Sequence, residues 1–112
     1  MTGTQATLPD DQVRELARLF PGVQQADEGG VTFFLIPQLN LPAGCTPERV
    51  DALLCPAARD GYPSRLFLAE QVRSRSWGTA RILERNWYMV SWRIREGLRL
   101  AQMVLAHLDA FK

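Results

Sequence analysis

The sequence has little lysine, histidine or cysteine. Of its 13 basic residues 12 are arginine, and the remaining one is Lys112. The only histidine is His107, and the two cysteines, Cys45 and Cys55, belong to no CxxC pair or Cys/His cluster. Neither a disulfide framework nor a metal site is therefore expected. No cofactor is expected either.

Long apolar runs are also missing, because no stretch approaches the ~20 apolar residues that a membrane-spanning helix needs. The first residues lack the basic-then-apolar order of a secretory signal peptide, so we expect a cytoplasmic protein. The chain has 112 residues, of which 46% are hydrophobic and 22% charged. These values are typical of one globular domain, which we expect over residues 8–112 after a disordered tail, residues 1–7.

Charge is distributed unevenly along the chain. Residues 1–56 hold three arginines against seven acidic residues, a net charge of −4. Residues 57–112 hold nine arginines and one lysine against five acidic residues, a net charge of +5. A basic half of this kind suits an acidic partner or nucleic acid, or forms a solvated face.

The first two thirds of the chain predict a helix followed by strands. Asp10 and Asp11 are typical of a first helical turn, and Pro21-Gly22 ends the predicted helix. β-Branched and aromatic runs between turn residues then predict four strands in an antiparallel meander. The predicted strands are 23–26, 31–36, 50–55 and 65–68, with a loop over 38–48.

The last third predicts less regular structure. Residues 69–91 show no sustained period, so we expect an irregular segment there. A helix is predicted over 92–111, and the whole is α+β with both helices on the apolar side of the sheet. The side chains predicted to meet in one core are Phe33, Leu35, Leu53, Phe67, Leu98, Ala101 and Leu105.

Four short motifs occur in an order that resembles family E of the prokaryotic ubiquitin-conjugating-enzyme-like (UBC-fold) proteins. Its members show an apolar strand, an LPxG loop, a VDxLL strand and a GYP turn. In this chain the matching segments are 33–37 (FFLIP), 41–44 (LPAG), 50–54 (VDALL) and 61–63 (GYP). In the resemblance Tyr62 and Pro63 form the turn that closes a flap over the site.

The resemblance implies a role in a bacterial ubiquitin-like conjugation and antiphage-defence system. The implied partners are a ubiquitin-like protein, an activating enzyme and a JAB-type peptidase from the same operon. No membrane partner is implied. The implied activity is that of a transferase that accepts the C-terminus of the ubiquitin-like protein.

The resemblance also implies where the site lies. The tryptophan that opens the next helix in the family matches Trp87, which places Thr79 at the position of the usual catalytic cysteine. Gln71 and Asn86 are the amides available to stabilise an oxyanion, and Glu84 and Glu70 are the nearest carboxylates that could act as a base. Ser74 and Ser76 are alternative hydroxyl carriers.

Two other functions fit the same residues. A variant without catalytic activity could position another conjugating subunit, and an Arg/Trp-rich domain could bind nucleic acid through Arg73, Arg75, Arg81 and Arg85. We expect the tryptophans to serve packing rather than base stacking, which makes nucleic acid the weaker alternative. For the remaining reactive groups we expect Cys55 in the core, Cys45 exposed on a loop and His107 on a solvated helix face.

Overall fold

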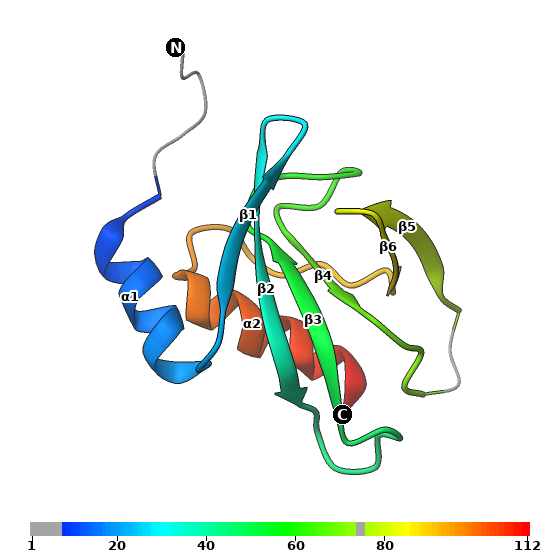
Figure 1. The fold of residues 1–112 in the computed structure, drawn as a ribbon. Helices are drawn as coiled ribbons and strands as arrows, with labels where there is room; N and C mark the ends of the chain where they lie inside the picture. The colour runs from blue at the N-terminus through cyan, green and yellow to red at the C-terminus, as the bar shows by residue number, and fades with distance from the viewer. Residues whose placement is uncertain (1–7, 74–75) are drawn as a thin grey trace.

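The fold is described from a computed structural model for residues 8–73 and 76–112, so the predicted tail lies outside the described residues. The elements in chain order are α1 (Asp10–Leu19), β1 (Gln24–Glu28), β2 (Val31–Asn40), β3 (Arg49–Cys55), β4 (Arg65–Leu68), β5 (Gly78–Ile82), β6 (Arg85–Met89), α2 (Leu100–Leu108) and a final 3₁₀ turn, η1 (Asp109–Phe111). The α+β class is confirmed. The described sheet has six antiparallel strands rather than four, in the order β1-β2-β3-β4-β6-β5 (Figure 1).

The β1–β2 hairpin follows from its turn residues. Gly29 and Gly30 both have positive φ, 60° and 79°, as a two-residue hairpin turn requires. Pro37, predicted to end the second strand, does not end it. β2 continues to Asn40 through an irregularity between Ile36 and Leu39. Proline is tolerated in a strand at such a bulge, so the predicted loop over 38–48 is shorter than expected.

The segment predicted to be irregular contains a β-hairpin. β5 and β6 pair in register from Gly78↔Met89 to Ile82↔Arg85, around a turn in which Leu83 and Glu84 have φ of 53° and 63°. The indole Nε1 of Trp87 donates to the Ile82 carbonyl at 3.1 Å. Trp87 thus lies in a strand and does not open a helix.

The final helix is shorter than predicted. Residues 92–99 are not helical, and α2 begins only after Gly97, which has a φ of +84°, and Arg99, which has extended backbone. The indole of Trp92 donates to the Ala106 carbonyl at 3.0 Å and holds the non-helical segment against α2. Favourable helical spacing from residue 92 onward was therefore misleading.

Apolar side chains lie on both faces of the sheet, which contradicts the single predicted core. One cluster, between the sheet and the helices, includes Phe34, Ile36, Leu54, Leu68 and Val104. The second cluster, on the other face, consists of Phe33, Leu53, Cys55, Phe67, Ile82 and Trp87. Side chains alternate along a strand, so Phe33 and Phe34 face opposite ways.

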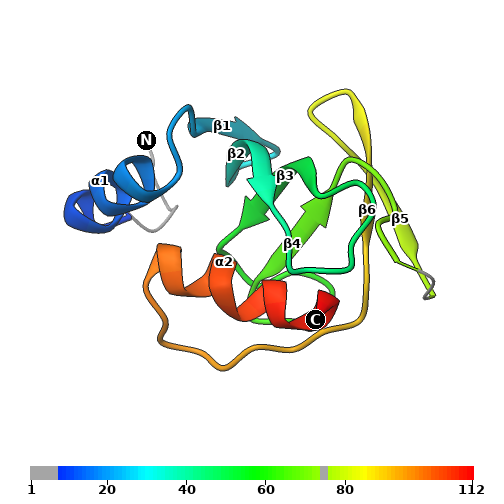
Figure 2. The same ribbon diagram turned by 90° about the horizontal axis from the view of Figure 1, so that it is seen from below.

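The first cluster is covered by helices and the second by the β5–β6 hairpin. Figure 2 shows α2 along one face of β2–β4, while β5 and β6 turn away from the plane of these strands. Ile82 and Trp87 of the hairpin pack against the second cluster. The Leu83 N–H donates to the Glu28 carboxylate at 2.8 Å, so the β5–β6 turn meets the β1–β2 hairpin across the curled sheet.

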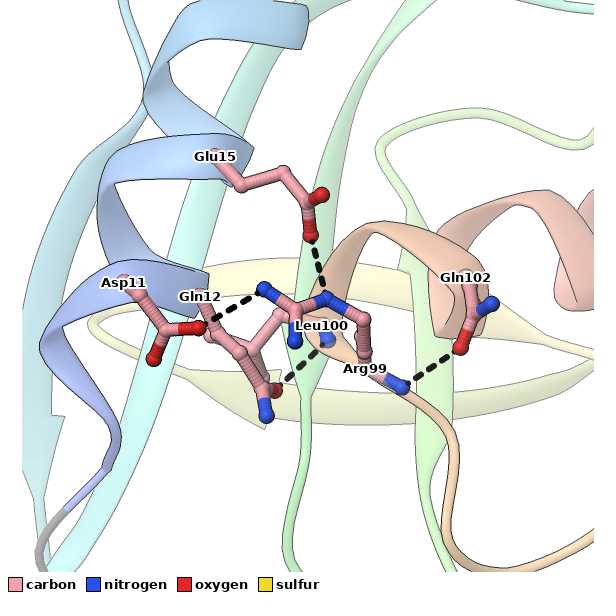
Figure 3. A network of polar contacts seen from close by, with 6 residues as sticks. All are labelled: Asp11, Gln12, Glu15, Arg99, Leu100 and Gln102. Atoms are coloured by element: carbon pink, nitrogen blue, oxygen red, sulfur yellow. Dashed lines mark hydrogen bonds and ion pairs between the residues drawn. The ribbon is translucent and has the colours of Figure 1, made fainter.

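Arg99 joins the two helices at the start of α2 (Figure 3). Its guanidinium contacts Asp11 and Glu15 of α1, both at 2.9 Å. The Arg99 and Leu100 N–H groups donate to Gln102 Oε1 and Gln12 Oε1, at 2.9 and 3.1 Å. Two glutamines therefore satisfy N–H groups that a helix start leaves without intrahelical partners.

Leu100 and Leu105 form a matched pair for testing the orientation of α2. Leu105 was predicted to be buried but is 57% exposed, whereas Leu100 is 1% exposed. Leu100→Ala should lower the free energy of unfolding by ~2–5 kcal/mol because it leaves a core cavity. Leu105→Ala should stay within about 0.5 kcal/mol of the native protein in denaturant titration. Equal losses would contradict this orientation of α2.

Candidate functional site

An open groove of about 720 Å³ lies between β5 and the β3–β4 connection. One wall is formed by Arg59, Asp60 and Arg65, and the other mainly by the start of the hairpin. The hairpin-side lining consists of Ser76, Trp77, Gly78, Thr79, Ala80, Arg81, Met89 and Ser91. The groove lies against β5, within the segment that the sequence predicted to be irregular.

Thr79, the predicted acceptor, is exposed on β5 and lines this groove. It lies opposite Tyr88 of β6 and on the same face of the hairpin as Arg81, two residues further on. Ser76, an alternative carrier, lines the groove as well. Ser74 lies outside the described residues.

Asn86 and Glu84 are not among the residues that line the groove, and both are connected to it through Arg81. Asn86 is opposite Arg81 in the register and accepts from its Nη1 at 3.1 Å. The Glu84 carbonyl accepts from Arg81 Nη2 at 3.1 Å. Gln71 is exposed in the β4–β5 connection and is not among the residues that line the groove.

The wall opposite Thr79 depends on the Tyr62–Pro63 turn, which lies between β3 and β4. Arg59 and Tyr62 exchange two backbone hydrogen bonds of 2.9 Å. The guanidinium carbon atoms of Arg65 and Arg93 lie 4.2 and 5.1 Å from the centre of the Tyr62 ring. Cation–π contacts of this kind hold the turn in place.

Three residues of this wall were missed by the sequence analysis: Arg59, Asp60 and Arg65. Asp60 Oδ2 lies 3.8 Å from Arg59 Nε and 3.5 Å from Arg65 Nη1. Arg59 also covers the Phe67 ring, and its buried Nε has no hydrogen-bond partner among the described residues. The excess of arginine after residue 57 was the only signal for this wall.

Neither cysteine lies in the groove. Cys45 was expected to be exposed but is 4% exposed, and its thiol donates to the Phe111 carbonyl at 3.5 Å. Cys55 is buried at the end of β3, as predicted, and burial raises the pKa of its thiol. A buried thiol is a poor nucleophile because the reactive form is the thiolate.

His107 is buried, which contradicts its predicted place on a solvated face. Its Nε2 lies 2.9 Å from the Ser64 hydroxyl, and both side chains are almost inaccessible to solvent. Burial, and secondarily the nearby Arg65 charge, lowers the pKa of His107 to about 4. The imidazole is therefore neutral at pH 7, and it is not among the residues that line the groove.

The described tryptophan side chains serve packing, as expected. Trp87 is fully buried, and Trp77 stacks on Phe111 with the ring centres 5.7 Å apart. Within residues 8–73 and 76–112 no group of three His, Cys, Asp or Glu side chains could hold a metal ion. In the same part of the chain neither helix is long and apolar enough for a membrane span.

No family model matches the sequence, and no curated protein or solved structure matches it significantly.

The buried His107 predicts a pH-dependent stability. The unfolded imidazole binds its proton as the pH falls through about 6.5, whereas the folded one resists until about 4. Stability should be fully present above pH 6.5 and fall below it, with a slope of up to ~1.4 kcal/mol per pH unit. Urea titrations between pH 7 and 4.5 measure this slope.

His107→Gln is the control, because glutamine keeps a hydrogen-bonding group near Ser64 but does not titrate. Its unfolding free energy should lack most of this slope. The pKa values of Asp11 and Asp51 are lowered from 3.8, mainly by hydrogen bonds from Arg99 and from the Gln38 backbone, so their effects fall at lower pH. An unchanged slope in His107→Gln would rule out His107 as its source.

Proposed function

We propose that this protein is a ubiquitin-conjugating-like protein of a bacterial ubiquitin-like modification pathway. In this proposal Thr79 accepts the C-terminus of the ubiquitin-like protein as an oxyester. The observation that carries the proposal is the exposed Thr79 in an open groove that also contains a carboxylate and several guanidinium groups. The site supports this function better than a thioester on Cys45 or Cys55, since both thiols are buried.

The arrangement of the elements is compatible with the UBC layout. A helix precedes four strands, β1 to β4, which neighbour one another in chain order, and a helix follows at the end of the chain. The resemblance implies a Tyr-Pro turn between the third and fourth strands, and the position of Tyr62–Pro63 between β3 and β4 supports the proposal. In the proposed assignment the β5–β6 hairpin replaces the irregular active-site segment.

The chemistry requires a base and a group that stabilises negative charge. The Thr79 oxygen attacks the thioester carbonyl on the activating enzyme, and a tetrahedral oxyanion forms. In this proposal Asp60 takes the hydroxyl proton in place of Glu84, because Asp60 lines the groove with Thr79 and Glu84 does not. When the intermediate collapses, the C–S bond breaks, the C–O ester remains and the activating enzyme leaves as a thiolate. A neutral threonine hydroxyl needs such a base because its own pKa is far above 7.

Arg81 is the proposed oxyanion partner, because it extends from β5 on the same face as Thr79. Asn86 and the Glu84 carbonyl hold its guanidinium, so they act as positioning groups. The partners in this proposal are the ubiquitin-like protein and the activating enzyme, with a JAB-type peptidase of the same operon acting on the product. The protein would work in the cytoplasm.

The oxyester predicts an adduct with a distinctive stability. Incubation with ATP and the activating enzyme and ubiquitin-like protein of the same operon should add one ubiquitin-like protein to the chain. Thiol reductant should leave the adduct intact and hydroxide should cleave it, because oxyesters resist thiols better than thioesters do. Intact-mass spectrometry and reducing gels measure both properties.

Thr79→Ala should abolish the adduct, whereas Cys45→Ala and Cys55→Ala should retain it wherever they fold. Asp60→Asn should slow its formation by roughly 10²-fold or more, the usual contribution of a general base. If reductant removes the adduct and Cys45→Ala does not form it, the nucleophile is Cys45 and not Thr79. Partner binding without an adduct would favour the non-catalytic scaffold.

A salt titration distinguishes the nucleic-acid alternative. Phosphate contacts by Arg73, Arg81 and Arg85 would give a log–log slope of about −0.9 per contact on duplex DNA. Arg75 lies outside the described residues. Trp87 and Trp77 are used in packing and Arg85 is already paired with Asp51, so we expect DNA binding that is undetectable, or weak and independent of sequence, even at low salt.

A further inference from the structure

β5 is one edge of the described sheet. The strand order ends at β5, which pairs with β6 on one side (Figure 1). No backbone hydrogen bond between the described residues outside the sheet and helices involves Gly78–Ile82. An edge strand presents a row of unpaired N–H and C=O groups that can pair with another chain.

The hairpin register identifies which groups face outward. In a two-residue hairpin the residues that flank the turn, here Ile82 and Arg85, form a hydrogen-bonded pair, and such pairs alternate along the strands. Ile82, Ala80 and Gly78 therefore bond to β6. The backbone groups of Thr79 and Arg81 point to the free edge. The backbone groups of Tyr88, which lies opposite Thr79, point away from β5 and toward β4, where Tyr88 pairs with Leu68.

Space and charge beside this edge favour an acidic occupant. The groove follows residues 76–81, and Arg59, Arg65 and Arg81 outnumber Asp60 among its charged residues. A strand pairing with Thr79 and Arg81 would place its side chains next to these guanidinium groups. Edge-to-edge pairing of β5 with a second copy would instead bring arginines of both copies together, which like-charge repulsion opposes.

We propose that the free edge of β5 binds an extended acidic segment of a partner protein by strand addition. Backbone hydrogen bonds to Thr79 and Arg81 supply the pairing. Carboxylates on alternate residues lie on the face that Ala80 shares with the second cluster, where Arg59 covers Phe67. The five residues of β5 span ~16 Å, enough for a segment of similar length. The Thr79 hydroxyl takes no part, so the interaction does not depend on ester formation.

A synthetic peptide tests the proposal directly. The probe is an end-capped ten-residue peptide of alternating threonine and glutamate, titrated into the ¹⁵N-labelled full chain. At saturation the Thr79 and Arg81 amides should exchange about tenfold more slowly with solvent, because bound amides exchange only from the free fraction. Gly78 and Ala80 amides, which already bond to β6, should change far less.

Two control peptides separate strand addition from charge alone. One replaces glutamate by lysine, and the other keeps its glutamates but has proline in place of every threonine, which removes half of its backbone donors. Both should bind at least tenfold more weakly than the probe. If the proline peptide binds as well as the probe, or protection spares Thr79 and Arg81, the proposal is wrong.

Variants of the chain complete the test. Thr79→Pro removes an edge donor without removing a β6 bond, and Arg59→Gln removes a groove charge, so each should weaken binding several-fold. Arg14→Gln on α1 is the matched charge control and should bind like the native protein. Thr79→Val keeps the strand edge and should also bind normally, although it cannot form an ester. Failure of the ester reaction therefore leaves this result unaffected.

Two other outcomes would overturn the proposal. Amide protection at Thr79 and Arg81 that rises with protein concentration, without peptide, would assign the edge to a second copy. Competition by single-stranded DNA with no effect of the proline substitution would assign the groove to nucleic acid. In either case the occupant of the β5 edge is not an acidic segment of a partner protein.

Discussion

The central strands carry large apolar side chains on both faces, and the rest of the structure depends on covering both. Phe34 and Leu54 face the helices, while Phe33, Leu53 and Phe67 face the other way. Leaving either face in water would forgo ~1.5–3 kcal/mol for each large side chain. A chain of 112 residues has few elements to use, so α2 covers one face and the β5–β6 hairpin covers the other.

The way in which the β5–β6 hairpin covers the second cluster determines the shape of the groove. To place Ile82 and Trp87 against Phe67, the hairpin must turn away from the plane of β2–β4 (Figure 2). The hydrogen bond from the Leu83 N–H to the Glu28 carboxylate holds the turn of the hairpin in place. The Leu68↔Tyr88 pairing holds β6 next to β4. The other edge of the hairpin, with Thr79, then remains opposite the β3–β4 connection. The groove thus follows from how the second cluster is buried.

Local signals predicted the first part of the fold because each had a definite conformational meaning. Residues 27–30, with two glycines that can take positive φ, predict a turn, and the β-branched run that follows predicts a strand. The β5–β6 turn has no such signal, because Leu83 and Glu84 rarely adopt positive φ. Tertiary contacts of Trp87 and Glu28 impose that conformation, and contacts between distant residues are not visible in a local pattern.

The predictions of a single core and of the buried face of the last helix were wrong because both relied on continuous apolar sequence. The run at 33–36 shows that a strand is buried, but it cannot show which residues face the helices. The predicted phase of the last helix failed for a related reason. Spacing counted from residue 92 assumed one helix through Gly97, whereas α2 starts afresh at Leu100 and buries His107 instead of Leu105. Thr79 was placed by motif resemblance, and only the excess of arginine after residue 57 indicated the arginine wall opposite it.

Most arginines of the basic half have structural partners, which limits what the charge asymmetry means. Arg99 joins the helices, Arg65 and Arg93 pack on Tyr62, and Arg85 covers Trp87 while pairing with Asp51. The guanidinium group is planar, so it can lie flat on a ring and donate hydrogen bonds in a rigid fork, a geometry that the lysine ammonium lacks. At these four positions the contacts favour arginine over lysine. Arg59 differs from these arginines, because its buried Nε lacks a hydrogen-bond partner among the described residues and its side chain lines the groove. The groove beside β5 is therefore where the net positive charge of this half is best placed to meet an incoming carboxylate.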